Sequence, residues 1–332
     1  MPILTRLRKP SVGRIAFNMR PANGPFGGSS AFVSQLSAFL RRRGFKITFS
    51  LDRKVDLVVL IDPRDDLENL SFSLDEIRRY TKLNPQVALL HRINECDQRK
   101  STSFMDPLLK AGNEHADYTV FISEWLRNYH SDRWFDTANP HDVIYNGADS
   151  AVFYPIGQTP PRPKESFRIV THHWSPNVMK GFPVYVELDR LIAERKLSGV
   201  ELWVIGRWPN DITWKSATTF GPMHGSKLAE KLRSCHAYVT GSLWEPCGMH
   251  HVEGAQCGLP LLYHVNGGGI VEAGEKYGIA YGDDVEHAVE EMRKHYEHYR
   301  VRLLDNIPSG ERMCLEYAEV IQKLICTKRL VV

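Results

Sequence analysis

Strand-like and helix-like patterns alternate along almost the whole of this 332-residue chain. In the first half, short apolar runs such as 14–19 and 56–61 are each followed by a segment whose apolar residues recur every three or four positions. The alternation stops in a proline- and glycine-rich stretch, 154–163, and then starts again. Because this order favours parallel sheets covered by helices on both faces, we predict an α/β fold with two doubly wound domains. Ligands of such sheets bind beyond the carboxyl ends of the strands, so the cleft between the domains is the expected site.

The expected boundaries follow from the same patterns. Residues 1–155 form a first Rossmann-like domain, 156–164 a linker, and 165–305 a second domain. Residues 306–332 form a C-terminal helix, and its packing on the first domain stays open. Expected strands are 14–19, 45–50, 56–61, 87–91, 118–122, 142–145, 167–171, 201–205, 237–240 and 260–264. Expected helices are 30–43, 73–83, 105–115, 124–130, 181–194, 226–235, 249–257, 285–299 and 311–326.

Composition excludes several classes of protein. Hydrophobic residues make up 42% and charged residues 24%, as in soluble globular proteins, and no apolar run approaches the roughly 20 residues of a membrane span. The six cysteines lack paired spacing and the start of the chain lacks a signal-peptide core, so we expect free thiols in the cytoplasm. A net charge of +3 gives no indication of nucleic-acid binding. Basic residues at 6, 8, 9, 41–43, 46, 53 and 54 leave two interpretations open: a solvated helix end, or a peripheral contact with an anionic membrane.

The segment 242–262 carries the clearest chemical signal. Glu245 and Glu253 lie on either side of Gly248, a residue that can open a helix, and an apolar strand pattern follows. A helix start offers free backbone N–H groups and the positive end of a dipole, which suit a phosphate. Carboxylates near it can accept hydrogen bonds from sugar hydroxyls, so the segment predicts a pocket for a sugar nucleotide.

Four motifs follow one another along the chain. They are the glycine-rich loop 24–28 before a helix, the segment 143–149 with 153–155, the pair Lys180-Gly181 at a helix head, and the Glu245/Glu253 pair followed by 258–260 and 267–272. Together they resemble glycosyltransferase family four, the retaining enzymes with the GT-B fold and an E-x7-E motif. The resemblance covers nearly all of the chain.

This resemblance implies an enzyme that moves a sugar from a nucleoside diphosphate, UDP or GDP, to a hydroxyl of a glycan, lipid or small molecule. Attack on the front face, with the departing phosphate taking the acceptor proton, is the implied route. Two alternatives stay open: a GT-B nucleotide-sugar epimerase and a non-catalytic nucleotide-sugar-binding protein. A dehydrogenase is disfavoured because no G-x-G-x-x-G follows the first strand. No metal motif is present either, although His250 and Glu253 have i,i+3 spacing and His172 and His173 are adjacent.

The resemblance also implies individual roles. Glu253 would accept hydrogen bonds from the ribose, Glu245 would contact the transferred sugar, and Lys180 would bind the diphosphate. Their alternatives are a surface glutamate, a loop carboxylate near a helix start, and a solvated lysine. Backbone N–H groups of the donor site would come from Gly27, Gly28, Gly248, Met249 and His250, the imidazole of His250 being equally compatible with packing.

The remaining candidates include the departures from the family pattern. The usual arginine before the lysine is absent, so His173 or Arg207 would supply that charge. Cys247 replaces an aromatic residue. His91, at the end of a strand, would face the reacting sugar, with a structural role as the alternative, and Asn94 and Arg99 are expected on the acceptor side. Trp174 would stack on a base or sugar, or belong to the core.

Overall fold

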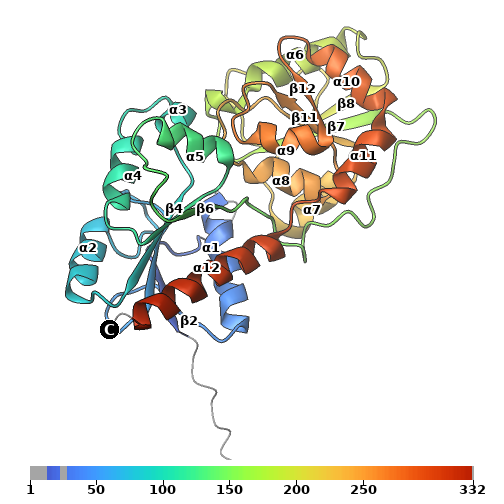
Figure 1. Ribbon diagram of the computed structural model, residues 1–332. Helices are drawn as coiled ribbons and strands as arrows, with labels where there is room; N and C mark the ends of the chain where they lie inside the picture. Colours follow the sequence, from blue (N-terminus) through green and yellow to red (C-terminus); the bar gives the residue numbers. More distant parts are fainter. Residues whose placement is uncertain (1–12, 23–27, 331–332) are drawn as a thin grey trace, which may run out of the picture.

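Two lobes, each built on a six-stranded sheet, make up the molecule (Figure 1). The computed structural model describes residues 13–22 and 28–330, so Gly27 and the basic residues at 6, 8 and 9 lie outside the described residues. All strand pairs within both sheets are parallel. The predicted doubly wound α/β architecture is therefore confirmed.

The first sheet has the order β2-β1-β3-β4-β5-β6. Its middle strands, β3 (Leu57–Leu60) and β4 (Ala88–Ile93), are buried along their whole length because helices cover both faces. A capping box at Ser73 and Glu76 starts α2. The other strands are β1 (Arg14–Phe17), β2 (Lys46–Thr48), β5 (Tyr118–Phe121) and β6 (His141–Val143), and the helices are α1 (Gly28–Arg42), α2 (Leu74–Leu83), α3 (Asp97–Lys100), α4 (Met105–Asn113) and α5 (Glu124–Ser131).

The second sheet has the order β12-β11-β10-β7-β8-β9. Four elements of the second lobe were not expected from the sequence: the 3-10 turn η1 (Val178–Lys180), β9 (Thr218–Phe220), α9 (Ile270–Tyr277) and β12 (Gly278–Tyr281). The predicted helix 285–299 is two helices, α10 (Val285–Lys294) and α11 (Tyr296–Asp305), which meet at His295. The rest are β7 (Phe167–His173), β8 (Val200–Gly206), β10 (Ala237–Thr240), β11 (Leu261–His264), α6 (Phe182–Ala193), α7 (Gly225–Arg233) and α8 (Met249–Gln256).

The C-terminal helix α12 (Gly310–Leu330) lies on the first lobe, beside α1 (Figure 1). The ring of Tyr317 packs edge-on against Phe32 of α1, with centroids 4.9 Å apart. Lys328 and Arg329, at the far end, form ion pairs with Asp117 and Asp56. The chain therefore crosses between the lobes twice, once after β6 and once before α12.

Close contacts hold the two lobes together near these crossings. The side chain of Asn146 donates to the backbone oxygen of Cys247 at 2.9 Å, and the backbone N–H of Ala148 donates to Gln256 at 2.5 Å. A Cβ at Gly147 would lie 2.3 Å from the backbone of Ser309, so only glycine lets the two crossing segments touch. One apolar cluster is continuous through both lobes.

Two predictions from the composition concern the cysteines and membrane-spanning helices. All six cysteines are free thiols, and Cys326 is the exposed one. Within residues 13–22 and 28–330, no helix combines the length and the apolar character that crossing a bilayer requires. The basic residues Arg41 and Arg42 end α1, and Lys46 begins the edge strand β2.

Candidate functional site

A cavity of about 600 Å³ lies between the lobes, where the carboxyl ends of both sheets meet. The first lobe contributes residues that follow β1, β3, β4 and β5, and the second contributes those that follow β7 and β10. Each sheet changes its strand order at this edge, between β1 and β3 and between β7 and β10. These are the places where open parallel sheets leave a crevice for a ligand.

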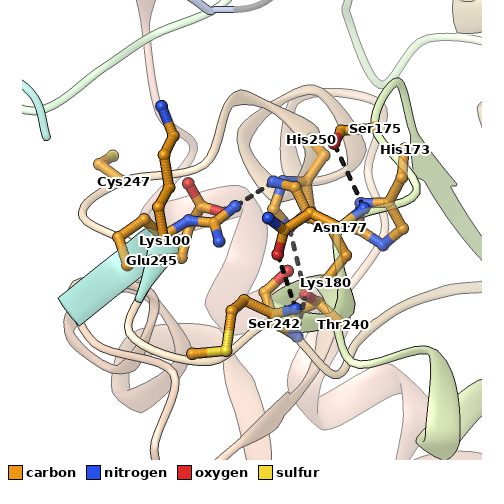
Figure 2. A network of polar contacts seen from close by, with 12 residues as sticks. Lys100, His173, Ser175, Asn177, Lys180, Thr240, Ser242, Glu245, Cys247 and His250 are labelled. Atoms are coloured by element: carbon orange, nitrogen blue, oxygen red, sulfur yellow. Dashed lines mark hydrogen bonds and ion pairs between the residues drawn. The ribbon is translucent and has the colours of Figure 1, made fainter. Parts of the chain in front are cut away.

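Lys180 and Glu245 form the polar centre of the cavity. The Lys180 Nζ donates to Glu245 Oε2 at 2.7 Å, and the same oxygen accepts from the Arg99 Nη2 at 2.8 Å. Figure 2 shows Lys180, Glu245, His250 and Thr240 in one network of polar contacts. Lys180 and Glu245 belong to the second lobe, whereas Arg99 belongs to α3 of the first.

Local backbone geometry places Lys180. Asn177 caps the turn η1, and Gly181, at φ +75°, ends it. A Cβ at Gly181 would lie 1.9 Å from the backbone oxygen of Gly241, so the turn packs directly on the loop after β10. Burial lowers the pKa of Lys180, and the Glu245 carboxylate opposes that shift.

Hydrogen bonds of the Glu245 backbone to the loop 267–269 fix the position of this residue. Its N–H donates to the Gly267 oxygen at 3.1 Å, and its oxygen accepts from the Gly269 N–H at 2.9 Å. Burial raises the pKa of its carboxyl group, but Lys180 and Arg99 outweigh burial and hold that pKa well below the usual range. The side chain is therefore a fixed anion.

Glu253 lines the same cavity from α8. Its Oε2 lies 2.8 Å from the His172 Nε2. The other ring nitrogen of His172 lies 3.1 Å from the Tyr238 hydroxyl, so the imidazole is oriented from both sides. From the sequence, His172 was a candidate only for metal binding. Its place next to His173 at the end of an apolar strand could have marked it as a cavity residue, because strand ends face the crevice.

His173 does not supply the missing positive charge. It lines the cavity, but its Nε2 lies 2.7 Å from the Tyr185 hydroxyl, and burial together with nearby Lys180 lowers its pKa well below 6.5. The imidazole is therefore neutral. Arg207 is exposed, donates to the Trp174 backbone oxygen at 3.1 Å and is not part of the cavity lining, which includes Trp174 itself.

Contrary to expectation, His91 does not line the cavity. The side chain is fully buried, its Nδ1 lies 3.2 Å from the Asn113 amide of α4, and burial lowers its pKa to about 3. Successive side chains of a strand point to opposite faces, so Arg92 lines the cavity instead. The Arg92 guanidinium donates to Asn146 at 3.0 Å and lies 4.0 Å from the ring centroid of Phe32.

The two glycine-containing helix starts meet across the cavity. Gly28, at the start of α1, would place a Cβ 2.8 Å from the Met249 Cγ of α8. Gly248 is the N-cap of α8. Two residues later, the His250 side chain contacts β10, with its Nε2 3.1 Å from the Thr240 hydroxyl. Gly28, Gly248, Met249 and His250 all line the cavity.

The two candidates for the acceptor side, Asn94 and Arg99, occupy different positions. Asn94 lines the cavity and donates to the Ser29 hydroxyl at 2.8 Å, whereas Arg99 lies behind Glu245 and is not part of the lining. Four further residues line the cavity and were not predicted from the sequence: Asp62, Arg64, Glu95 and Lys100. Asp62 pairs with Arg64 at 2.6 Å, and Lys100 with Glu95 at 2.6 Å. In the described part of the chain, no three His, Cys, Asp or Glu side chains are grouped as metal ligands would be.

Comparisons with known proteins bear on the fold. No protein-family model matches the chain, and none of the curated proteins matches it in sequence. Among solved structures, sucrose-phosphate synthase from Thermosynechococcus elongatus is 15% identical, with a TM-score of 0.68, over 95% of this chain and 99% of that chain. Anabaena HepE, solved with UDP-glucose, is 13% identical with a TM-score of 0.67 over 94% and 100%. WaaG, a glycosyltransferase involved in lipopolysaccharide biosynthesis, is 11% identical with a TM-score of 0.65 over 93% and 99%. At such low identities this similarity establishes the GT-B fold and no activity.

Proposed function

We propose that this protein is a retaining glycosyltransferase that moves a sugar from a nucleoside-diphosphate sugar to a hydroxyl acceptor. One observation carries the proposal: Lys180, Glu245 and Glu253 line a single cavity between two lobes, beside the N-terminus of α8. A cation, two carboxylates and free backbone N–H groups match the diphosphate and hydroxyls of such a donor.

The donor would lie mainly on the second lobe. Glu253, held by His172, would accept hydrogen bonds from the ribose hydroxyls, while Lys180 and the N–H groups after Gly248 would contact the diphosphate. Glu245 would contact hydroxyls of the transferred sugar. UDP and GDP are the proposed nucleotides, and UDP-glucose is the ligand in the HepE structure.

The protein would act by positioning the donor and the acceptor and by stabilising the charges that develop in the transition state. The bond between the anomeric carbon and the phosphate oxygen breaks, the acceptor oxygen bonds to the same face of that carbon, and the acceptor proton passes to the departing phosphate. Lys180 would offset the negative charge that grows on this phosphate. The Glu245 carboxylate would stabilise positive charge at the anomeric carbon.

The acceptor would come from the side of the first lobe, past Asn94. Described basic residues Arg41, Arg42 and Lys46 lie at the outer end of α1 and on the edge strand β2, and none of them lines the cavity. A contact between these residues and an anionic membrane would therefore leave the cavity free.

A thermal-shift panel of UDP-, GDP- and ADP-glucose tests the proposal first. A donor that binds the folded protein raises Tm by mass action, and no rise with any of the three would contradict the proposal. Products of the donor that binds are then analysed with and without saccharide acceptors. Transfer to an acceptor supports the transferase, interconversion without acceptor indicates an epimerase, and binding without turnover indicates a non-catalytic binder.

A further inference from the structure

Arg99 is the one described residue of the first lobe that forms an ion pair with a carboxylate of the second-lobe cavity wall. Its guanidinium is buried and shares a single oxygen, Glu245 Oε2, with Lys180. Because Arg99 does not line the cavity, a ligand there would contact Glu245 and Lys180 and leave Arg99 untouched.

The position of Arg99 is fixed by its own lobe. Helix α3 begins at Asp97, whose carboxylate accepts hydrogen bonds from the Thr102 hydroxyl at 2.6 Å and from the backbone N–H groups of Met105 and Asp106. These bonds tie the short helix to the start of α4. The backbone of Arg99 is therefore fixed to the first lobe.

The shared oxygen creates a conflict for Lys180. In the proposed reaction Lys180 binds the donor diphosphate, yet here its ammonium group pairs with Glu245. If Lys180 left and nothing replaced it, a buried carboxylate would stand without a cation, which is strongly unfavourable. Arg99 already occupies the position that removes this penalty.

We propose that Arg99 is a positioning residue of the transfer reaction: it holds the Glu245 carboxylate across the cleft, so that Lys180 can turn from Glu245 to the donor diphosphate. This inference rests on the proposed function. It couples donor binding to closure of the lobes, since the Arg99–Glu245 contact exists only when the lobes meet.

Donor titration with three variants tests the inference. With UDP-glucose, GDP-glucose and ADP-glucose as probes, Arg99→Gln should raise the dissociation constant of the bound donor by about tenfold to a hundredfold. Arg99→Lys should recover most of the affinity. Added to Glu245→Gln, the Arg99→Gln change should have much less effect, because no carboxylate remains to be held.

A matched control and a second readout separate positioning from a structural role. Arg127→Gln removes an arginine of the same lobe whose partner, Glu124, lies on the surface, and it should leave donor affinity at the wild-type value. In steady-state kinetics, Arg99→Gln should raise KM for the donor more than it lowers kcat.

The outcomes distinguish the two proposals. If the wild-type protein binds none of the three nucleotide sugars, the proposed function fails and this inference fails with it. If a donor binds the wild type and Arg99→Gln equally well, Arg99 has no positioning role while the proposed function stands, even where the variant unfolds more easily. An equal loss in the Glu245→Gln background would also overturn the inference.

Discussion

The carboxylate of Glu272, in the second lobe, accepts a hydrogen bond of 2.5 Å from the backbone N–H of Trp125, in the first. It also accepts from the Glu124 N–H at 3.1 Å and from the Tyr145 hydroxyl at 2.5 Å. Glu272 thus caps α5 from another lobe, and the helix dipole favours its negative charge. The hydrogen bonds of this cap and the Arg99–Glu245 ion pair are two separate polar contacts between the lobes.

We predict that Glu272→Ala lowers the free energy of unfolding by about 1–2 kcal/mol, because two N–H groups of α5 lose their acceptor. Glu272→Gln keeps an acceptor oxygen and should cost less. Chemical denaturation measures both. Equal stability of Glu272→Ala and the wild type would show that the cap contributes nothing.

Replacement of Gly181 by alanine should be far more harmful than the same change at Gly157. Both glycines have positive φ, +75° and +93°, but a Cβ at Gly181 would meet the Gly241 backbone, whereas nothing lies within 4 Å of one at Gly157. Gly157→Ala should therefore cost only the backbone strain, about 1 kcal/mol. Gly181→Ala should cost several times more and displace Lys180. Comparable unfolding midpoints for the two variants would contradict the close packing of η1 on the β10 loop.

Lys180→Ala and Glu253→Ala should each weaken nucleotide-sugar binding by tenfold or more, as expected for the loss of a charged partner, at roughly 1.5–3 kcal/mol. His91→Asn should leave donor affinity unchanged, because His91 faces α4 and its ring contacts Asn113. Isothermal titration with the donor found in the thermal-shift panel measures all three. A loss of donor affinity in His91→Asn would instead support a role of His91 in donor binding.

Stability should fall as the pH drops from about 6.5 toward 4. Burial lowers the pKa of His251 to about 4, so below pH 6.5 the unfolded chain binds a proton that the folded protein does not. Each such histidine contributes a slope of up to about 1.4 kcal/mol per pH unit in this window. His251→Asn should therefore reduce the slope, measured by urea denaturation between pH 4.5 and 7. An unchanged slope in His251→Asn would show that this ring is protonated in the folded state.

Most regular elements near the site could be predicted from local pattern. The strand 237–240 was expected with the bounds that β10 has, and the helix from Met249 begins where Gly248 indicated. The strands β9 and β12 were missed because their residues are mostly partly exposed and form no buried apolar run, whereas β10, of the same length as β12, is buried throughout. The break at His295 was missed because both flanking segments are helical in pattern.

The site residues also divide into those that local motifs identified and those whose position or charge depends on the fold. Lys180, Glu245 and Glu253 were chosen from motifs that each lie within one stretch of chain, and the fold brings all three to one cavity. His91 and Arg92 point to opposite faces of β4, and Arg92 is the one that lines the cavity. Burial decided the charge of His173, which a reference pKa cannot anticipate.

By itself, the order of apolar and amphipathic segments determined that this chain forms two parallel-sheet domains, because the period of a pattern reports which face of each element is buried. Only the tertiary structure decided that α12 returns to the first lobe, that Glu272 caps a helix of the other lobe, and that Arg99 and Lys180 share one oxygen of Glu245. These contacts join residues far apart in the sequence: Glu124 and Glu272 are separated by 148 positions, and Asp56 and Arg329 of α12 by 273. They depend on how two separately patterned lobes approach each other, and no local spacing encodes that geometry.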